Sequence, residues 1–207
     1  DVVFDLRAGD RGALMARFTG SPCRVSLYYS QGIPFWRNAL FTHIVDPPPL
    51  ETLVLGAAEQ TLRIVREFGV DTDDRAPRLP VSEATGRRAD GILAETGVSG
   101  EGRWVSFNPF SRWSYKEWPH ERWVPVLDGL WRRHRIAAVL VGSPDEREKA
   151  GLFASKLQGP VFNLVGRTTL TELAGVLRRS AFHVGVDSAA PHIAAAVGVP
   201  TLTLYGP

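Results

Sequence analysis

The segment from Phe182 to the end of the chain constrains the fold most strongly. It begins with an apolar run (Phe182–Val186), turns at Asp187-Ser188 and continues through an Ala-rich stretch. After Gly198-Val199-Pro200 it ends in a second run (Thr201–Tyr205). This order predicts a strand, a turn, a helix and a strand. Such a unit places free backbone N–H groups at the carboxyl edge of a parallel sheet, where α/β proteins bind phosphate. The turn also brings an acid, a hydroxyl and an imidazole: Asp187, Ser188 and His192.

Strands and helices alternate from Arg103 onward. The periodicity predicts strands at Trp104–Phe107, Ile136–Val141 and Val161–Phe162, and helices at His120–His134, Asp145–Leu157 and Leu170–Arg178. Alternation with helices of this length favours a parallel sheet covered by helices on both faces.

The residues before Arg103 predict a second αβ region. Strands are expected at Val2–Phe4 and Arg24–Tyr28, helices at Asp10–Phe18, Leu50–Phe68 and Ser82–Thr96, and irregular chain at Gln31–Pro49. The polar, proline-bearing segment Asp71–Pro80 is the best linker candidate. We therefore expect two Rossmann-like lobes, the first of them incomplete. The partial N-terminal lobe is expected to comprise residues 1–70 and the C-terminal lobe residues 101–207. Residues 71–100 are expected to form a linker and a helix between them.

Composition excludes several classes of protein. The 207 residues are 44% hydrophobic and carry a net charge of only +2, with arginines scattered, so nothing favours a nucleic-acid partner. The single cysteine, Cys23, cannot form an internal disulfide and suits a reducing compartment. No apolar run approaches the roughly 18 residues of a membrane span, and no signal peptide is evident. Because the chain starts in a strand without Met and stops after another strand, we expect it to be the interior of a longer protein.

Two loops carry the most suggestive polar residues. Asp187, Ser188 and His192 can be a plain helix start, with Ser188 as cap and His192 on the surface, or a pyrophosphate site built from the same N–H groups. The loop Asn108–Trp118 offers Ser111, Arg112, Ser114 and Lys116, which suit an anionic ligand, although it can equally be a solvated loop. Trp118 and Trp123 are expected in the core.

Two further loops follow strands of the same sheet. In Gly142–Glu146, Ser143 or Asp145 can cap a helix, and Glu146 can bind ribose hydroxyls. In Gly166–Thr169, Thr169 is the expected cap and Thr168 can face a base or sugar. Because loops after parallel strands meet at one edge, their convergence predicts a ligand site better than any single loop does.

Three blocks of sequence resemble one family. They are N-P-F-S-R-W-S-Y-K-E-W-P-H-E-R-W, V-G-S-P-D-E and V-D-S-A-A-P-H-I-A-A-A-V-G-V-P-T-L-T-L-Y-G-P, and their order and spacing over residues 103–207 are similar to those of the lipopolysaccharide heptosyltransferases, glycosyltransferase family 9. Upstream, V-V-F-D-L-R-A-G-D-R-G-A-L-M-A-R resembles the family's V-I-D-x-Q-G-x-x-K-S-A-x-x-A-R segment more loosely.

The resemblance implies a GT-B transferase with a donor lobe and an acceptor lobe. The C-terminal lobe would bind a nucleotide-diphosphate sugar, typically ADP-heptose, and the N-terminal lobe a lipid-linked saccharide acceptor. By motif position, Ser111, Arg112 and Lys116 would meet the diphosphate, Glu146 the nucleoside and Thr168 the base. The pyrophosphate turn would comprise Asp187, Ser188, Ala189 and His192.

The resemblance also implies how the reaction proceeds and where. The family is metal-independent and needs no cofactor, so Lys116 and the helix start would stabilise the leaving diphosphate in place of a cation. The expected reaction is an inverting transfer. The family's catalytic base is an Asp in a glycine-containing loop upstream of Asp1, so neither Asp5 nor Asp10 matches it, and the fragment is expected to be inactive alone. The enzyme would be cytoplasmic, in peripheral contact with the inner membrane.

Some positions depart from the family pattern. Phe110 and Ala189 stand where Gly is usual, and each added side chain is expected to narrow backbone access to phosphate. Arg7 replaces Gln and Gly12 replaces Ser. Two rivals stay open: an epimerase or hydrolase of the same fold acting on a sugar nucleotide, and a non-catalytic module that binds a sugar nucleotide or has no activity. Phe110 and Ala189 keep the second of these open.

Overall fold

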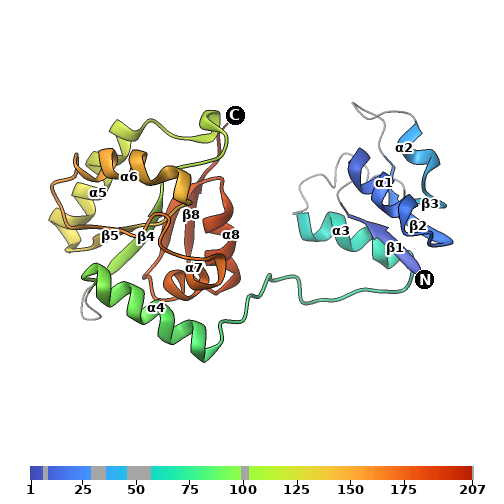
Figure 1. Cartoon of the computed structure of the whole chain (residues 1–207), viewed down its shortest axis with the longest axis horizontal. Helices are drawn as coiled ribbons and strands as arrows, with labels where there is room; N and C mark the ends of the chain where they lie inside the picture. The colour runs from blue at the N-terminus through green and yellow to red at the C-terminus, as the bar shows by residue number, and fades with distance from the viewer. Residues whose placement is uncertain (7–8, 29–35, 46–56, 99–102, 207) are drawn as a thin grey trace. The chain divides into compact units, whose positions relative to one another are not determined.

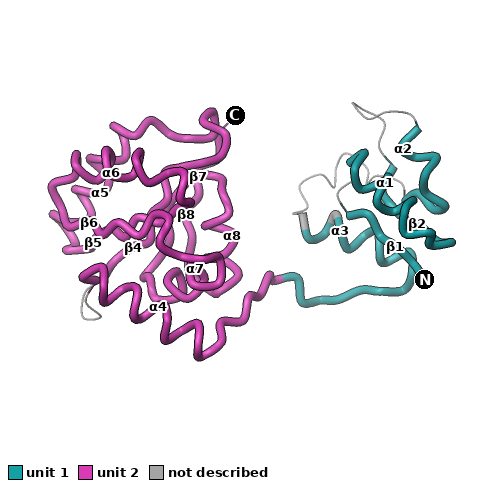
Figure 2. Tube along the Cα trace, in the orientation of Figure 1, with its two compact units in different colours: residues 1–75 teal, residues 76–207 magenta. Residues whose placement is uncertain are grey.

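The computed structural model describes residues 1–6, 9–28, 36–45, 57–98 and 103–206. These residues form two compact units, residues 1–75 and 76–207, which Figure 2 colours separately. The division falls inside the proline-bearing segment that the sequence marks as a linker. Both units are α/β with parallel sheets, as the sequence predicts.

Unit 1 is built on a three-stranded parallel sheet in the order β1-β2-β3. Its strands are β1 (Val2–Asp5), β2 (Cys23–Leu27) and β3 (His43–Val45), and its helices are α1 (Asp10–Phe18), α2 (Trp36–Ala39) and α3 (Ala57–Arg66). The expectation of irregular chain over Gln31–Pro49 was wrong for α2 and β3. Both elements are too short for a periodic pattern, and β3 is identified only by its pairing with β2.

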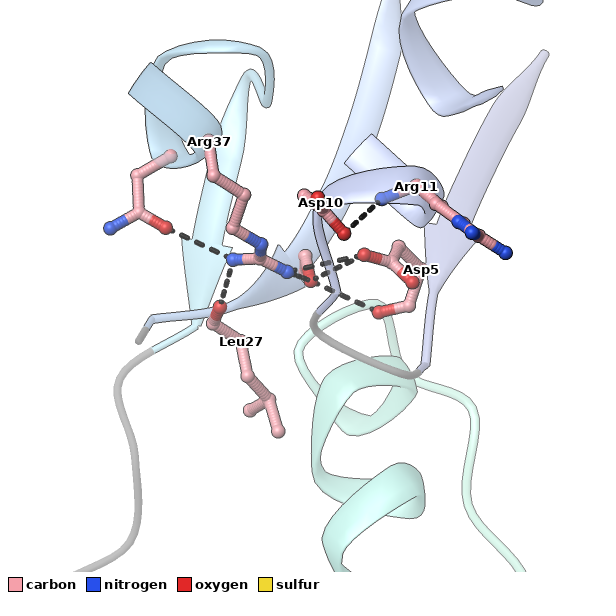
Figure 3. Close-up of polar contacts among 7 residues, drawn as sticks. Asp5, Asp10, Arg11, Leu27 and Arg37 are labelled. Atoms are coloured by element: carbon pink, nitrogen blue, oxygen red, sulfur yellow. Dashed lines mark hydrogen bonds and ion pairs between the residues drawn. The ribbon is translucent and has the colours of Figure 1, made fainter. Parts of the chain in front are cut away.

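A buried ion pair connects α2 with the first two strands of unit 1. Arg37 is fully buried, and its Nη2 lies 3.1 Å from Asp5 Oδ2. The guanidinium also donates to the Leu27 carbonyl oxygen at 2.8 Å and to Ser26 Oγ. Figure 3 shows this side chain reaching across to Asp5. Gly12 makes room for the carboxylate, because a Cβ there would lie 2.5 Å from Asp5 Oδ1. The departure from Ser at position 12 therefore accompanies this buried pair.

Unit 2 contains a five-stranded parallel sheet in the order β6-β5-β4-β7-β8. The strands are β4 (Trp104–Asn108), β5 (Ala137–Leu140), β6 (Val161–Asn163), β7 (His183–Val186) and β8 (Thr201–Leu204). The helices are α4 (Glu83–Thr96), α5 (His120–His134), α6 (Arg147–Ala154), α7 (Leu170–Leu177) and α8 (Ala189–Ala196), with 3₁₀ turns η2 (Ser114–Lys116) and η3 (Pro144–Glu146). The expected helix Asp145–Leu157 is thus divided into η3 and α6.

Helices cover both faces of this sheet (Figure 1). Alternate residues of β4 point to opposite faces, so Trp104 packs in the cluster with α4, α7 and α8, whereas Val105 and Phe107 pack in the cluster with α5 and α6. Trp123 is buried in the second cluster and Trp118 packs against it, as the sequence predicts. The sheet is therefore buried on both faces, and its carboxyl edge carries the loops that can meet a ligand.

The order of strands reverses between β4 and β7. The chain runs outward from β4 through β5 to β6, then crosses back to β7 and continues outward to β8. Parallel sheets bind ligands in the crevice at such a reversal, because the neighbouring loops separate toward opposite faces. The loops after β4 and β7 are the two that meet here.

Helix α4 belongs to unit 2 and is attached to α7. Ser82 Oγ accepts from the backbone N–H of Thr85, which confirms Ser82 as its cap. Arg88 Nη2 lies 2.6 Å from Glu172 Oε1, and Arg179 Nη2 donates to Asp90 Oδ2 at 2.7 Å. These contacts connect α4 to α7 and to the residues that follow α7. In the described parts of the chain, no helix is long and apolar enough to cross a membrane.

Candidate functional site

A cleft of about 1110 Å³ lies at the carboxyl edge of the unit 2 sheet. Its walls come from the loops after β4, β5, β6 and β7, as the convergence of these loops in the sequence predicts. All the candidate donor residues line it: Ser111, Arg112, Lys116, Glu146, Thr168, Asp187, Ser188, Ala189 and His192. The structure therefore brings together residues up to 81 positions apart, from Ser111 to His192, and their roles there stay predictions.

The loop after β4 is held to the turn after β7 by two hydrogen bonds. Lys116 Nζ donates to Asp187 Oδ2 at 2.6 Å, and Ser111 Oγ donates to the Asp187 carbonyl oxygen at 3.1 Å. The hydrogen bond from Lys116 to Asp187 raises the pKa of the lysine, so its ammonium group stays charged at neutral pH. The Lys116 ammonium group is therefore a fixed cation at the edge of the cleft, next to the start of α8.

The turn after β7 presents backbone donors and an imidazole. The N–H groups in the first turn of α8 have no partner within the helix. Pro191 contributes none of them, because proline carries no backbone N–H. His192 Nε2 lies 3.8 Å from Asp187 Oδ1, and its side chain is 69% exposed. Lys116 and His192 thus approach the same carboxylate, one on each oxygen. This arrangement suits an anionic group with several oxygens.

Ser188 does not act as the helix cap that was one of its two interpretations. Ser188 occupies the N-cap position of α8, but its side chain makes no capping hydrogen bond. Instead Ser188 Oγ accepts from Asn108 Nδ2 at 3.3 Å, while Asn108 Oδ1 accepts from the Phe110 N–H at 2.9 Å. Asn108 is 95% buried at the end of β4. Its side-chain amide hydrogen-bonds both to the loop after β4 and to the turn after β7, and so joins the two.

Phe110 does not narrow the cleft, contrary to the expectation from its place in the motif. Its side chain is fully buried in the core beside Trp123 and makes an edge contact with the His120 ring, 5.5 Å between centroids. A residue at this position can therefore gain a side chain without touching a ligand. Ala189, the other departure, does line the cleft.

The loop after β5 holds Glu146 in a defined position. Glu146 Oε2 accepts from the Ser143 N–H at 2.7 Å, and Gly142 makes room for it, because a Cβ there would lie 2.5 Å from the same oxygen. The loop after β6 is bound to it by the hydrogen bond from the Gly166 N–H to the Gly142 carbonyl oxygen, 2.9 Å. Thr169 caps α7 as predicted, and both Thr168 and Thr169 line the cleft.

Gly206 packs closely against the backbone of the loop after β4. A Cβ at this position would lie 2.9 Å from Lys116 Cα and 2.9 Å from the Tyr115 carbonyl oxygen. The chain after β8 can therefore approach Lys116 only because residue 206 has no side chain.

Several lining residues escaped the sequence reasoning. Trp113, Lys149, Leu170 and Leu173 all line the cleft. Trp113 lies within the loop that the sequence identified, and an exposed Trp between two candidate phosphate ligands was the available signal. Leu170 and Leu173 read as ordinary core positions of α7, and only the packing shows that they face the cleft. In the described residues, no group of three or more His, Cys, Asp or Glu is arranged to hold a metal ion.

The sequence as a whole matches one family of known proteins. The model of glycosyltransferase family 9 (heptosyltransferase) matches residues 1–207. The chain belongs to glycosyltransferase family 9. A family 9 relative, lipopolysaccharide heptosyltransferase 3 of Escherichia coli, is 30% identical over 210 residues, and the alignment covers 100% of the chain and 59% of the relative. Lipopolysaccharide heptosyltransferase 1 of Pseudomonas aeruginosa is 36% identical over 95 residues, which are 46% of the chain and 26% of that protein.

Solved structures of family 9 proteins share the fold. A glycosyl transferase family 9 structure from Veillonella parvula aligns with a TM-score of 0.80 at 20% identity, covering 98% of the chain and 56% of the other. The E. coli ADP-heptose lipopolysaccharide heptosyltransferase II aligns with a TM-score of 0.72 at 24% identity, covering 99% and 61%. The family 9 chain thus has the GT-B fold, and it spans about three fifths of the length of the relatives it matches.

Proposed function

We propose that this chain is the donor-binding part, with a portion of the acceptor lobe, of an inverting glycosyltransferase. It moves a heptose-type sugar from a nucleotide-diphosphate donor to a lipopolysaccharide core acceptor. The observation that carries the proposal is the convergence of Lys116, His192 and the first turn of α8 on one edge of the cleft. Two family relatives are named lipopolysaccharide heptosyltransferases, and E. coli heptosyltransferase WaaC has been solved with ADP and with a fluorinated ADP-heptose.

The donor would extend along the carboxyl edge of the sheet. Its nucleoside lies over the loops after β5 and β6, where Glu146 binds the ribose and Thr168 the base. Its diphosphate lies between the loops after β4 and β7. There Ser111, Arg112, Lys116, His192 and the amides of Ser188 and Ala189 meet the phosphate oxygens. A cleft of about 1110 Å³ is large enough for a ligand of this size.

Catalysis in this proposal rests on stabilising the leaving group. A general base, expected upstream of Asp1 by the resemblance, takes the proton of an acceptor hydroxyl, whose oxygen attacks the anomeric carbon from the side opposite the diphosphate. The bond to the diphosphate oxygen breaks with both electrons going to that oxygen. The negative charge that develops there is held by Lys116 and by the α8 amides, which are already in place before the reaction. No metal ion or other cofactor is required, since the ammonium group and the helix start act in its place.

The partners follow from the same chemistry. The acceptor is a saccharide carried on a lipid, bound by the N-terminal lobe at the cytoplasmic surface of the inner membrane. Nucleic acid is not a partner, because the net charge is only +2 and the basic residues are spread along the chain.

The test begins with binding and proceeds to transfer. Calorimetry of the chain with ADP, UDP and GDP should show a preference for one base, and ADP is the expected ligand. The full-length protein should then transfer sugar from ADP-heptose to a heptose-deficient core acceptor. Sugar released into water without an acceptor product would indicate a hydrolase, and an altered donor sugar an epimerase. Binding without either reaction would indicate a non-catalytic module. Absence of nucleotide binding would refute the proposal.

A further inference from the structure

Trp113 is an aromatic side chain placed at the donor cleft without a partner in the core. It lines the cleft, and it is 55% exposed. Among the residues that line the cleft in the described part of the chain, it is the only Phe, Tyr or Trp. Ligand clefts are commonly lined by aromatic side chains, and an indole at a cleft wall offers a flat apolar surface to a bound group.

The neighbours of Trp113 define its position. The Arg112 guanidinium lies over the indole, 5.9 Å from the ring centroid, and the Tyr115 ring lies 6.2 Å away with an interplanar angle of 33°. Arg112 precedes Trp113, and Lys116 follows within the same short loop. Since Lys116 is hydrogen-bonded to Asp187 and Ser111 to the Asp187 carbonyl, both ends of the loop are anchored. The indole is therefore presented from a fixed loop.

The order of strands separates Trp113 from the place expected for the base. Thr168, Leu170 and Leu173 follow β6, at one end of the cleft, and Leu170 is 69% exposed there. These leucines provide an apolar wall for a base at that end. Trp113 follows β4, two strands away, beside the cations expected to meet the diphosphate. By strand order, the loop after β4 lies between the base end of the cleft and the turn after β7, so a group that lies against Trp113 is next to the expected diphosphate and away from the base.

We propose that Trp113 determines sugar specificity by stacking against the apolar C–H face of a pyranose ring bound next to the diphosphate. The negative face of the indole attracts the weakly positive C–H groups of the ring, and the flat surface excludes water from them. This inference rests on the proposed function. The ring belongs either to the sugar of the donor or to the accepting sugar, since both meet at the anomeric carbon.

The experiment compares ligands that differ only in the sugar. Calorimetry measures the binding of ADP and of ADP-heptose to the chain, its Trp113→Ala variant and its Trp113→Phe variant. If the donor sugar stacks on the indole, Trp113→Ala weakens ADP-heptose about five- to tenfold and leaves ADP unchanged, while Trp113→Phe retains most of the affinity. Leu152→Ala is the matched control, because Leu152 is an exposed apolar residue of α6 outside the cleft lining.

A second measurement identifies the source of the sugar. If the accepting sugar stacks on the indole, Trp113→Ala leaves both donor affinities unchanged and raises the acceptor KM of the full-length protein about five- to tenfold. Equal weakening of ADP and ADP-heptose would place the base on the indole and overturn the inference, as would unchanged values for both donor ligands and for the acceptor. Failure of the unmodified chain to bind ADP would instead refute the proposed function.

Discussion

Lys116 Nζ donates to Asp187 Oδ2 at 2.6 Å, and this ion pair joins the loop after β4 to the turn after β7. It explains how a carboxylate can stand at the proposed phosphate site. Asp187 holds the ammonium group in place and raises the pKa of Lys116, so a charged donor waits at the cleft before a ligand arrives. A diphosphate that enters has to compete with Asp187 for the lysine.

Replacing Lys116 tests the leaving-group role. Lys116→Ala in the full-length protein should lower the rate of transfer about 10²–10³-fold, because one preorganised donor to the developing charge is lost. The fold should persist, since Lys116 lines the cleft and belongs to neither core cluster of unit 2. Initial rates and circular dichroism check the two parts. Lys156→Ala is the control, because that lysine pairs with the exposed Glu121. Transfer at the unmodified rate would remove Lys116 from this role.

Replacing Asp187 separates binding from turnover. Asp187→Asn removes the negative charge that faces the diphosphate but also the partner that orients Lys116. We expect ADP to bind at least as tightly and turnover to fall about tenfold or more, because the lysine is no longer fixed. Calorimetry and steady-state rates give the two values. A loss of ADP affinity as large as the loss of rate would show that Asp187 contacts the ligand directly.

Gly206 should be intolerant of a side chain. In Gly206→Ala the new Cβ would lie 2.9 Å from Lys116 Cα, so the loop after β4 has to move. A shift of this kind misplaces the ammonium group, and turnover should fall on the order of tenfold or more with little change in Tm. Gly129→Ala is the matched control, since no atom lies within 4 Å of the added Cβ and alanine favours a helix. Equal rates for both variants would contradict the expectation.

The buried His183 should make unit 2 sensitive to acid. His183 is fully buried on β7, its Nδ1 lies 2.9 Å from Ser106 Oγ, and its Nε2 has no hydrogen-bond partner among the described residues. Burial lowers its pKa from 6.5 to about 4. The unfolded chain therefore binds a proton more readily than the folded one. The free energy of unfolding is therefore highest above pH 6.5, and it decreases as the pH falls toward 4 because the unfolded chain takes up the proton first.

Urea unfolding at pH 7.5 and pH 5 measures this effect. The free energy of unfolding should fall by about 2 kcal/mol from this group between the two values. His183→Gln should reduce the pH dependence by that amount, whereas His134→Gln, at an exposed position, should preserve it. An unchanged pH dependence in His183→Gln would show that the imidazole does not titrate as the burial implies.

The buried pair of Arg37 and Asp5 should be essential to unit 1. Arg37→Met removes the buried cation that pairs with the Asp5 carboxylate and should cost about 3–5 kcal/mol of stability. Hydrogen exchange of β1 and β2 peptides in the full chain measures the loss locally. Arg11→Met, at an exposed position of α1, is the control. Protection of β1 equal in the two variants would exclude a structural role for the pair.

The sequence predicted the larger elements well, because long helices and buried strands carry a clear period. Asp10–Phe18 and His120–His134 agree with α1 and α5 at both ends. Short elements carry no such signal, so β3 and α2 were missed among prolines. The expected helix Leu50–Phe68 appears as α3, Ala57–Arg66, and residues 50–56 lie outside the described residues.

The direction in which a loop side chain points was harder to predict than the edge of the sheet at which its loop lies. The loops were correctly expected at one edge, since that follows from a parallel sheet. Phe110 was misjudged because a motif position does not say whether a side chain turns to the core or the cleft. Trp113 was overlooked for the same reason, and so was the hydrogen bond that turns Ser188 toward Asn108 rather than toward α8.

The reversal of strand order between β4 and β7 has an evolutionary consequence. The hollow above these strands arises from the path of the backbone and requires no particular side chain, whereas the chemistry resides in a few residues on its rim. A related chain in which Lys116 and Asp187 are replaced would keep the hollow and lose the ion pair on its rim. The same scaffold can therefore carry rims of different chemistry without a change of fold.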